Sequence, residues 1–264
     1  MSEFSSPATR QHGVALRWVR YAYRIPLLAL HVSLSLPFLL ACVSLSPGRA
    51  GVESFGDRMV CWWSIWMLRI FGLRVRRVGT PLPNPVLFVA NHVSWIDIVM
   101  LHSQRMMGFV AKREIAGWPL VGWLAARGQT IFHQRGNTES LGGVLQAMLE
   151  RLRSGRSVGV FPEGRTRGGH DVGPFHARIF QAAVEAEVAV QPVAVRYGAG
   201  GSAQTVIAFG AHESFFANFL RLLGEPGREA EVHFLQPIRL QDVEGRRGIA
   251  EIARARIVAA MAQR

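Results

Sequence analysis

The sequence predicts an α/β protein with a central mixed, mainly parallel sheet that carries helices on both faces. A membrane-embedded helix or helix pair is expected to precede the sheet. From about Val75, short apolar segments of strand length alternate with segments of helical periodicity, which is typical of a parallel sheet covered on both faces. Before that point lies a 21-residue stretch without a charged residue. We therefore divide the chain into a membrane-anchoring segment, residues 1–74, and a globular domain, residues 75–264.

The charge-free stretch runs from Pro26 to Ser46. At about 1.5 Å per residue, a helix of this length just crosses a hydrocarbon core of about 30 Å. We expect one apolar helix over about 26–46 and a second, shorter one over about 59–73, where three tryptophans suit the membrane interface. The two helices would dip into one leaflet, or form one span followed by an interfacial helix. A buried hairpin of a soluble protein is the alternative.

The net positive charge of the chain indicates an anionic binding partner. The chain has 30 Lys and Arg against 18 Asp and Glu, a formal net charge of +12. The arginines flank apolar segments, and no nucleic-acid-binding motif accompanies them. This arrangement favours anionic membrane lipids over nucleic acid. Two cysteines exclude a disulfide scaffold and a Cys/His zinc site, so no metal site is expected.

The globular part alternates between expected strands and helices. Strands are expected at 86–90, 130–133, 157–161, 188–195 and 204–210, with a sixth at 231–238. Helices are expected at 141–153, 175–187 and 249–263. The segment 214–223 groups its phenylalanines along one helical face. This face is expected to pack in the core, with contact to membrane or to an acyl chain as the alternatives.

A histidine and an aspartate directly follow the first expected strand. The chain reads NHVSWID over residues 91–97, and α/β sheets place their sites at the carboxyl ends of strands. If His92 lies in the turn and Asp97 in the first helical turn, the carboxylate can fold back on the imidazole. It would then fix the tautomer and leave the other nitrogen as a general base. The segment also reads as a capping box beginning at Ser94, and spacing alone leaves both interpretations open.

A second polar group follows the third expected strand, where the chain reads PEGRTR over 162–167. Gly164 permits a ligand to approach the backbone closely. Arg165 and Arg167 can hold a phosphate with forked hydrogen bonds. Glu163 could orient these arginines or accept a hydrogen bond from a substrate hydroxyl. An ordinary surface turn with exposed arginines is the alternative.

Four blocks, in order, resemble the membrane-bound glycerolipid acyltransferases typified by 1-acyl-sn-glycerol-3-phosphate acyltransferase. NHVSWID resembles the family's N-H-x-x-x-x-D block, with His92 as base and Asp97 as its partner. AKREIAGWPLVGWL followed by FHQR resembles the second block, FPEGRTR the third and VQPVAV the fourth. The resemblance covers roughly residues 85–195, and residues 75–264 are therefore expected to be an acyltransferase catalytic domain.

The resemblance also implies roles for other residues of these blocks. Those implied in substrate binding, with the phosphate as their target, are Arg135, Glu163, Gly164, Arg165 and Arg167. Those implied in acyl-donor binding or in structure are Lys112 and Pro192. The chain has Arg165-Thr166-Arg167 where the family has Thr-Arg, and His176 where many members have lysine. The lipid head group is therefore the least determined part of the prediction.

The implied activity is O-acyl transfer from acyl-CoA or acyl carrier protein to the free hydroxyl of a lysolipid. The first acceptor expected is 1-acylglycerol-3-phosphate, which gives phosphatidic acid. Another lysolipid such as lyso-ornithine lipid is the alternative, and a catalytically silent lipid-binding membrane protein is the second. No cofactor is expected. Because acyl thioesters are cytosolic, the domain is expected to face the cytoplasm from the inner membrane, and the lipoprotein-like box at Leu39–Cys42 is not taken as a cleavage site.

Overall fold

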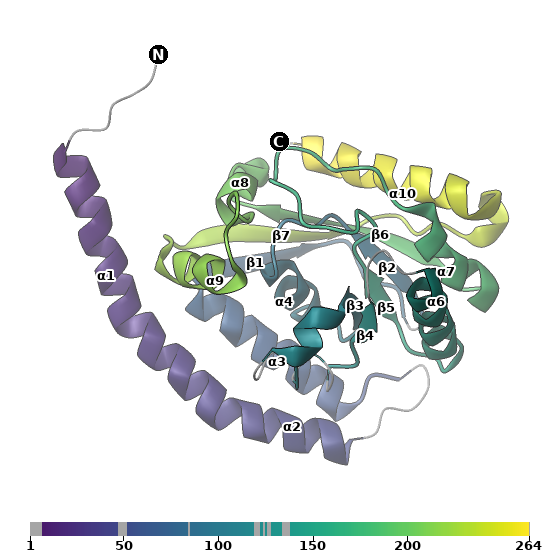
Figure 1. Cartoon of the computed structure of the whole chain (residues 1–264), viewed down its shortest axis with the longest axis horizontal. Helices are drawn as coiled ribbons and strands as arrows, with labels where there is room; N and C mark the ends of the chain where they lie inside the picture. Colours follow the sequence, from purple (N-terminus) through teal and green to yellow (C-terminus); the bar gives the residue numbers. More distant parts are fainter. Residues whose placement is uncertain are drawn as a thin grey trace.

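A seven-stranded sheet forms the centre of the described part of the chain (Figure 1). The computed structural model describes residues 7–46, 52–83, 85–118, 122–123, 125, 128–133 and 138–263. The strand order is β1-β7-β6-β2-β5-β3-β4. Neighbouring strands are parallel except β6 and β7, so the prediction of a mixed, mainly parallel sheet is confirmed. The strands are β1 (Leu73–Val78), β2 (Leu87–Ala90), β3 (Gly108–Lys112), β4 (Ile131–His133), β5 (Val158–Val160), β6 (Val190–Tyr197) and β7 (Arg228–Phe234).

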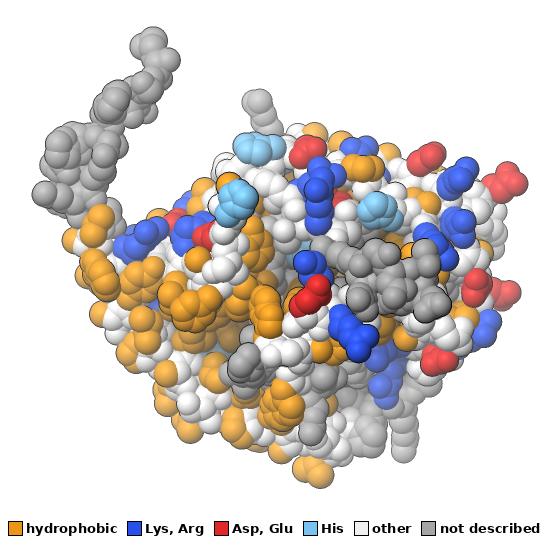
Figure 2. Space-filling view, viewed as in Figure 1, with side chains coloured by type: hydrophobic (Ala, Val, Ile, Leu, Met, Phe, Trp, Pro, Cys, Tyr) orange, Lys and Arg blue, Asp and Glu red, His pale blue; other side chains and the backbone are white. Residues whose placement is uncertain are grey.

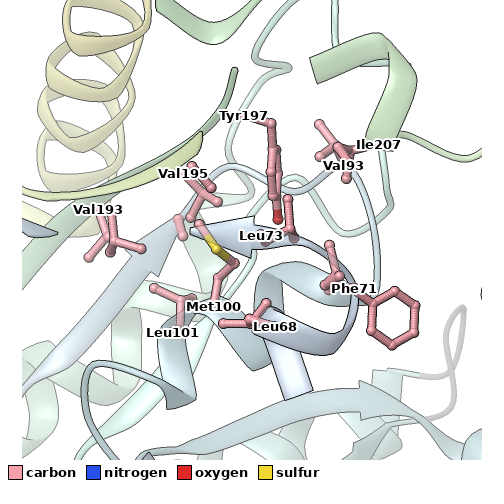
Figure 3. Packing of buried hydrophobic residues seen from close by; sticks show 14 of the residues in the cluster. Leu68, Phe71, Leu73, Val93, Met100, Leu101, Val193, Val195, Tyr197 and Ile207 are labelled. Carbon is pink, nitrogen blue, oxygen red and sulfur yellow. The ribbon is translucent and has the colours of Figure 1, made fainter. Parts of the chain in front are cut away.

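Helices cover both faces of the sheet, as predicted. One face packs against α3 (Phe55–Ile70), α4 (Ile96–His102) and α9 (Phe215–Gly224), and the other against α6 (Thr138–Arg153), α7 (Gln181–Ala186) and α10 (Gly245–Ala262). The alternation along β2 shows why: Phe88 and Ala90 enter the first core, while Leu87 and Val89 enter the second. Figure 3 shows part of the first core, around Leu68 and Met100. The remaining short helices are α8 (Gln204–Ile207) and the single turns 113–117, 177–180, 199–201 and 240–242.

The N-terminal helix is much longer than the one expected over 26–46. It runs through α1 (Pro7–Leu30), a π-helical turn (His31–Ser35) and α2 (Leu36–Leu45). Pro37 explains the wide turn, because its ring displaces the carbonyl one turn earlier. Val14–Leu45 is long and apolar enough to cross a membrane, by length and composition. The part of α1 before Pro26 carries arginines that bond to the end of α9, as described below.

The second apolar helix is α3, and it begins at a capping box rather than at residue 59. The Ser54 hydroxyl accepts a hydrogen bond from the Asp57 amide, and the Asp57 carboxylate accepts one from the Ser54 amide. Leu68 is fully buried against the sheet, whereas Trp62 and Trp66 are exposed. Figure 2 shows hydrophobic side chains gathered on the side of the molecule where Figure 1 draws α1 and α2.

Three elements differ from those expected. Residues 204–210 do not form a strand: the chain there begins with α8, because the Gln204 side chain bonds to the Tyr197 amide and the Val195 carbonyl instead of continuing a ladder. Two strands were not predicted. β1 alternates apolar residues with exposed arginines at the sheet edge, and β3 is a short segment ending at Lys112.

Candidate active site

The end of β2 places His92 beside Asp97. Nδ1 of His92 lies 2.8 Å from Oδ2 of Asp97, which is buried at the start of α4. The same oxygen accepts hydrogen bonds from the amides of Val93 and Ser94, at 2.7 and 3.0 Å. The carboxylate therefore holds the loop before α4 and orients the imidazole at once. Of the two interpretations left open by the spacing, the contact between His92 and Asp97 is present. The capping box is not complete, because only its bond from the Ser94 amide to Asp97 forms and α4 has no side-chain cap.

Stacking and partial burial fix the orientation of the His92 imidazole. Its ring stacks on Phe161, which follows β5, with centroids 3.9 Å apart and planes 14° from parallel. The side chain keeps 15% of its surface exposed. Among the described residues, Nε2 has no hydrogen-bond partner. With Nδ1–H donated to Asp97, the lone pair of Nε2 is available to accept a proton.

The other carboxylate oxygen of Asp97 accepts a hydrogen bond from Tyr197. The phenol hydroxyl donates to Oδ1 at 2.5 Å. Tyr197 ends β6 and is fully buried, and burial, followed by the negative charge of Asp97, raises its pKa well above the usual value. The hydroxyl therefore stays protonated and acts as a donor. Sequence reasoning missed this residue, because Tyr197 and Asp97 lie one hundred positions apart.

The buried Glu163 links its own loop, which follows β5, to the loop that contains His92. Its Oε1 accepts the His92 amide at 2.9 Å, and its Oε2 accepts the Gly173 amide at 2.8 Å. The Arg167 guanidinium lies 3.4 Å from Oε2, and the Arg167 amide donates to the His92 carbonyl at 2.8 Å. Burial raises the pKa of Glu163, although these donors oppose the shift. Both oxygens thus serve protein donors that set the loop around His92.

The remaining residues that were predicted for the site do not all lie next to His92 and Asp97. Gly164 has a φ of +71° and is exposed, and a Cβ there would come 3.1 Å from Cδ2 of His176. Arg165 is exposed next to it, and Lys112 is exposed at the end of β3. Pro192 is buried within β6, where its carbonyl accepts the Leu235 amide. Arg135 lies outside the described residues.

A polar network from α9 supports the same loop, and the sequence did not reveal it. Asn218 is fully buried, and its Oδ1 accepts from the Ser94 hydroxyl at 3.2 Å and the Trp95 indole at 3.1 Å. Its amide nitrogen donates to Glu213 at 2.8 Å. Hydrogen bonds from Arg221 lower the pKa of Glu213 to about 2. The Ser94 hydroxyl is thereby engaged with Asn218 and does not cap the helix.

The chain is similar in sequence to a family of known proteins. A sequence model of the family described as Acyltransferase matches residues 74–196. The chain is 38% identical over 220 residues to the lyso-ornithine lipid O-acyltransferase of Pseudomonas aeruginosa, covering 82% of this chain and 83% of that one. The chain belongs to the acyltransferase family.

Two further matches concern this acyltransferase. It is 40% identical over 126 residues to the 1-acyl-sn-glycerol-3-phosphate acyltransferase of Neisseria gonorrhoeae, about half of each chain (48% and 49%). The crystal structure of the acyltransferase PlsC from Thermotoga maritima superposes with a TM-score of 0.69 at 19% identity, covering 96% of this chain and 95% of that one. The structural match shows the shared fold.

Among the described residues of the acyltransferase, no group of three or more His, Cys, Asp or Glu is arranged to hold a metal ion. The arrangement offers instead a buried carboxylate, an oriented imidazole and an open nitrogen. These are the parts of a general base.

Proposed function

We propose that the acyltransferase uses His92 as the general base for acyl transfer to a lysolipid hydroxyl. The 2.8 Å contact between His92 and Asp97 is the observation that carries this proposal. Nε2 takes the hydroxyl proton while the oxygen attacks the thioester carbonyl. The C–S bond then breaks, and the thiolate leaves with the proton returned from the imidazolium. Asp97 stabilises the imidazolium between these two steps.

The acyl donor in this proposal is acyl-CoA or acyl carrier protein, and no cofactor takes part. Both donors are cytosolic thioesters, which supports an enzyme in the inner membrane whose catalytic domain faces the cytoplasm. The arginines that flank the apolar helix support the same orientation, since cytoplasmic flanks carry the excess of positive charge. Anionic lipids of that membrane would be its neighbours.

Lyso-ornithine lipid is the acceptor that we propose first. The relatives with this name match along most of their length, as in Pseudomonas aeruginosa and in Brucella abortus, where 31% identity extends over 89% of the relative. Lysophosphatidic acid is the second candidate. It is favoured by the exposed Arg165 beside Gly164 and by the half-length matches to enzymes named for that substrate.

The test is acyl transfer by detergent-purified full-length protein, with both thioester donors and both lysolipid acceptors. We expect His92→Ala to lower the rate by about 10²–10⁴-fold, and His212→Asn, at an exposed histidine, to leave it unchanged. Transfer to lyso-ornithine lipid alone supports the first acceptor, and transfer to lysophosphatidic acid alone replaces it with the second. Equal rates in His92→Ala and wild type, or no transfer to either acceptor, would overturn the proposal.

A further inference from the structure

A basic cavity lies at the sheet edge, outside the catalytic loop. Its volume is about 670 Å³, and it is bounded by α1, the end of α3 and the starts of β1 and β7. Its charged lining consists of five arginines and one glutamate. These are Arg20, Arg24, Arg69, Arg74, Arg228 and Glu229.

Two of these arginines fasten α1 to the end of α9. Arg24 is only 3% exposed and donates to the carbonyls of Leu223 and Glu225, at 2.9 and 2.7 Å. Arg20 donates to the Gly224 carbonyl at 3.1 Å. These carbonyls include the end of a helix, where the backbone dipole is negative. The arginines are therefore held in fixed places, and neither forms an ion pair with a carboxylate among the described residues.

The other three arginines carry unused hydrogen-bonding capacity. Arg228 pairs with Glu225 at 2.8 Å, and its buried Nε has no hydrogen-bond partner in the described part of the chain. A quarter of the Arg228 side chain is exposed, so its guanidinium can also donate to a ligand in the cavity that it lines. Arg69 lies over the Trp66 ring at 5.2 Å, and Arg74 is exposed without an ion-pair partner among the described residues.

We propose that this cavity binds the phosphate of an anionic membrane phospholipid, as a lipid site separate from the catalytic one. Guanidinium groups bind phosphate oxygens through forked, charge-assisted hydrogen bonds. Five positive charges against one negative charge favour a ligand with net negative charge over a zwitterionic one.

The surroundings favour a lipid over a free phosphate. On α1, Arg24 is followed within one turn by Leu27 and then by Leu30, both exposed. On α3, the exposed Trp66 comes directly before the turn that carries Arg69. Exposed apolar side chains also precede Arg24 along α1, so the arginines of the cavity lie within an exposed apolar surface. Arginines among exposed apolar and aromatic side chains are typical of a bilayer interface, where acyl chains meet head groups.

The cavity and the catalytic base lie at the same end of the sheet. β1 is parallel to β7, β7 is antiparallel to β6, and β6 is parallel to β2. The start of β1 therefore lies on the side where β2 ends at His92, three strand spacings or about 14 Å across the sheet. A phospholipid held in the cavity would turn this end toward the membrane. Binding there does not depend on the proposed acyl transfer.

The test measures binding of fluorescent phosphatidylglycerol to the full-length protein in neutral detergent, with fluorescent phosphatidylcholine as the zwitterionic comparison. The variant is Arg69→Gln with Arg74→Gln, two exposed side chains of the cavity. The matched control is Arg77→Gln with Arg247→Gln, which removes the same charge from exposed positions elsewhere.

We expect phosphatidylglycerol to bind more tightly than phosphatidylcholine, and the cavity variant to weaken it by about tenfold or more. The control pair should leave the affinity unchanged. Equal losses in both pairs would indicate diffuse attraction and overturn the site. Complete displacement by inorganic phosphate at the concentration of the lipid would also overturn the proposal, because the ligand would then be a free anion.

Discussion

The hydroxyl of Tyr197 lies 2.5 Å from Oδ1 of Asp97, the carboxylate oxygen that does not face His92. The opposite oxygen accepts from His92 and from the amides of Val93 and Ser94. Four donors thus surround one buried carboxylate, supplied by β6 and by the loop between β2 and α4. The orientation of the base therefore depends on the docking of that loop against the end of β6.

The first prediction concerns this contact. Tyr197→Phe keeps the buried ring but removes the donor, so we expect the free energy of unfolding to fall by about 1.5–3 kcal/mol. We expect kcat to fall about tenfold with little change in KM, since roughly 1.4 kcal/mol of orientation is lost from the transition state. Thermal unfolding and acyl-transfer kinetics measure both effects. The exposed Tyr23→Phe is the control, and a fully active Tyr197→Phe would contradict the role.

The second prediction concerns the pH dependence of stability. Because burial raises the pKa of Glu163, the folded state binds this proton more tightly than the unfolded chain does. Its stabilising contribution is therefore fully present below the unfolded pKa, about 4.3, and is lost as the pH rises through the folded pKa.

Glu163→Gln removes this titration, so the variant lacks the stabilisation that the wild type has at acidic pH. Its side-chain amide also lies against the Gly173 amide and Arg167, which lowers stability at every pH. The stability difference from wild type should shrink as the pH rises from about 4 to about 7. Unfolding midpoints across this range measure it, with the exposed Glu251→Gln as control. A constant difference would show that the carboxyl does not titrate there.

Local patterns predicted most of the fold, and they failed where the strand environment was unusual. β2 and β6 are central strands whose side chains point alternately into two cores. Both faces are buried, so each strand is a largely apolar run in the sequence. β1 was missed because its arginines reach solvent at the sheet edge, so it lacks such a run. The segment from Gln204 is short and apolar, and a run of that length fits a helix or a strand equally.

The same distinction applies to the site. His92 and Asp97 are five positions apart, so a single turn brings them together and their spacing reveals the pair. Tyr197 and Asn218 reach the same loop from more than ninety residues away. Their side chains follow no local period, because strand order and the docking of α9 place them. No sequence motif predicts the position of either residue.

The third prediction tests whether α9 positions the catalytic loop. Asn218→Ala leaves the Ser94 hydroxyl and the Trp95 indole without their acceptor, and should lower the free energy of unfolding by about 1–3 kcal/mol. Ser214→Ala removes the N-cap of the same helix, whose hydroxyl accepts the Ala217 amide, and should cost about 1 kcal/mol.

If Asn218 holds the loop, kcat falls in Asn218→Ala and not in Ser214→Ala, although both variants are destabilised. Kinetics measured well below both unfolding midpoints separate the two effects. Equal kcat values in the two variants would assign Asn218 to stability alone.

The fourth prediction separates backbone strain from crowding at Gly164. Gly164 and Gly245 both have positive φ, +71° and +65°, so alanine at either position should cost roughly 1 kcal/mol of stability. A Cβ at Gly164 would lie 3.1 Å from the His176 ring, whereas one at Gly245 would meet open space. We therefore expect Gly164→Ala to raise KM for the lysolipid and Gly245→Ala to leave the kinetics unchanged. Unchanged kinetics in Gly164→Ala would place the lysolipid away from this turn.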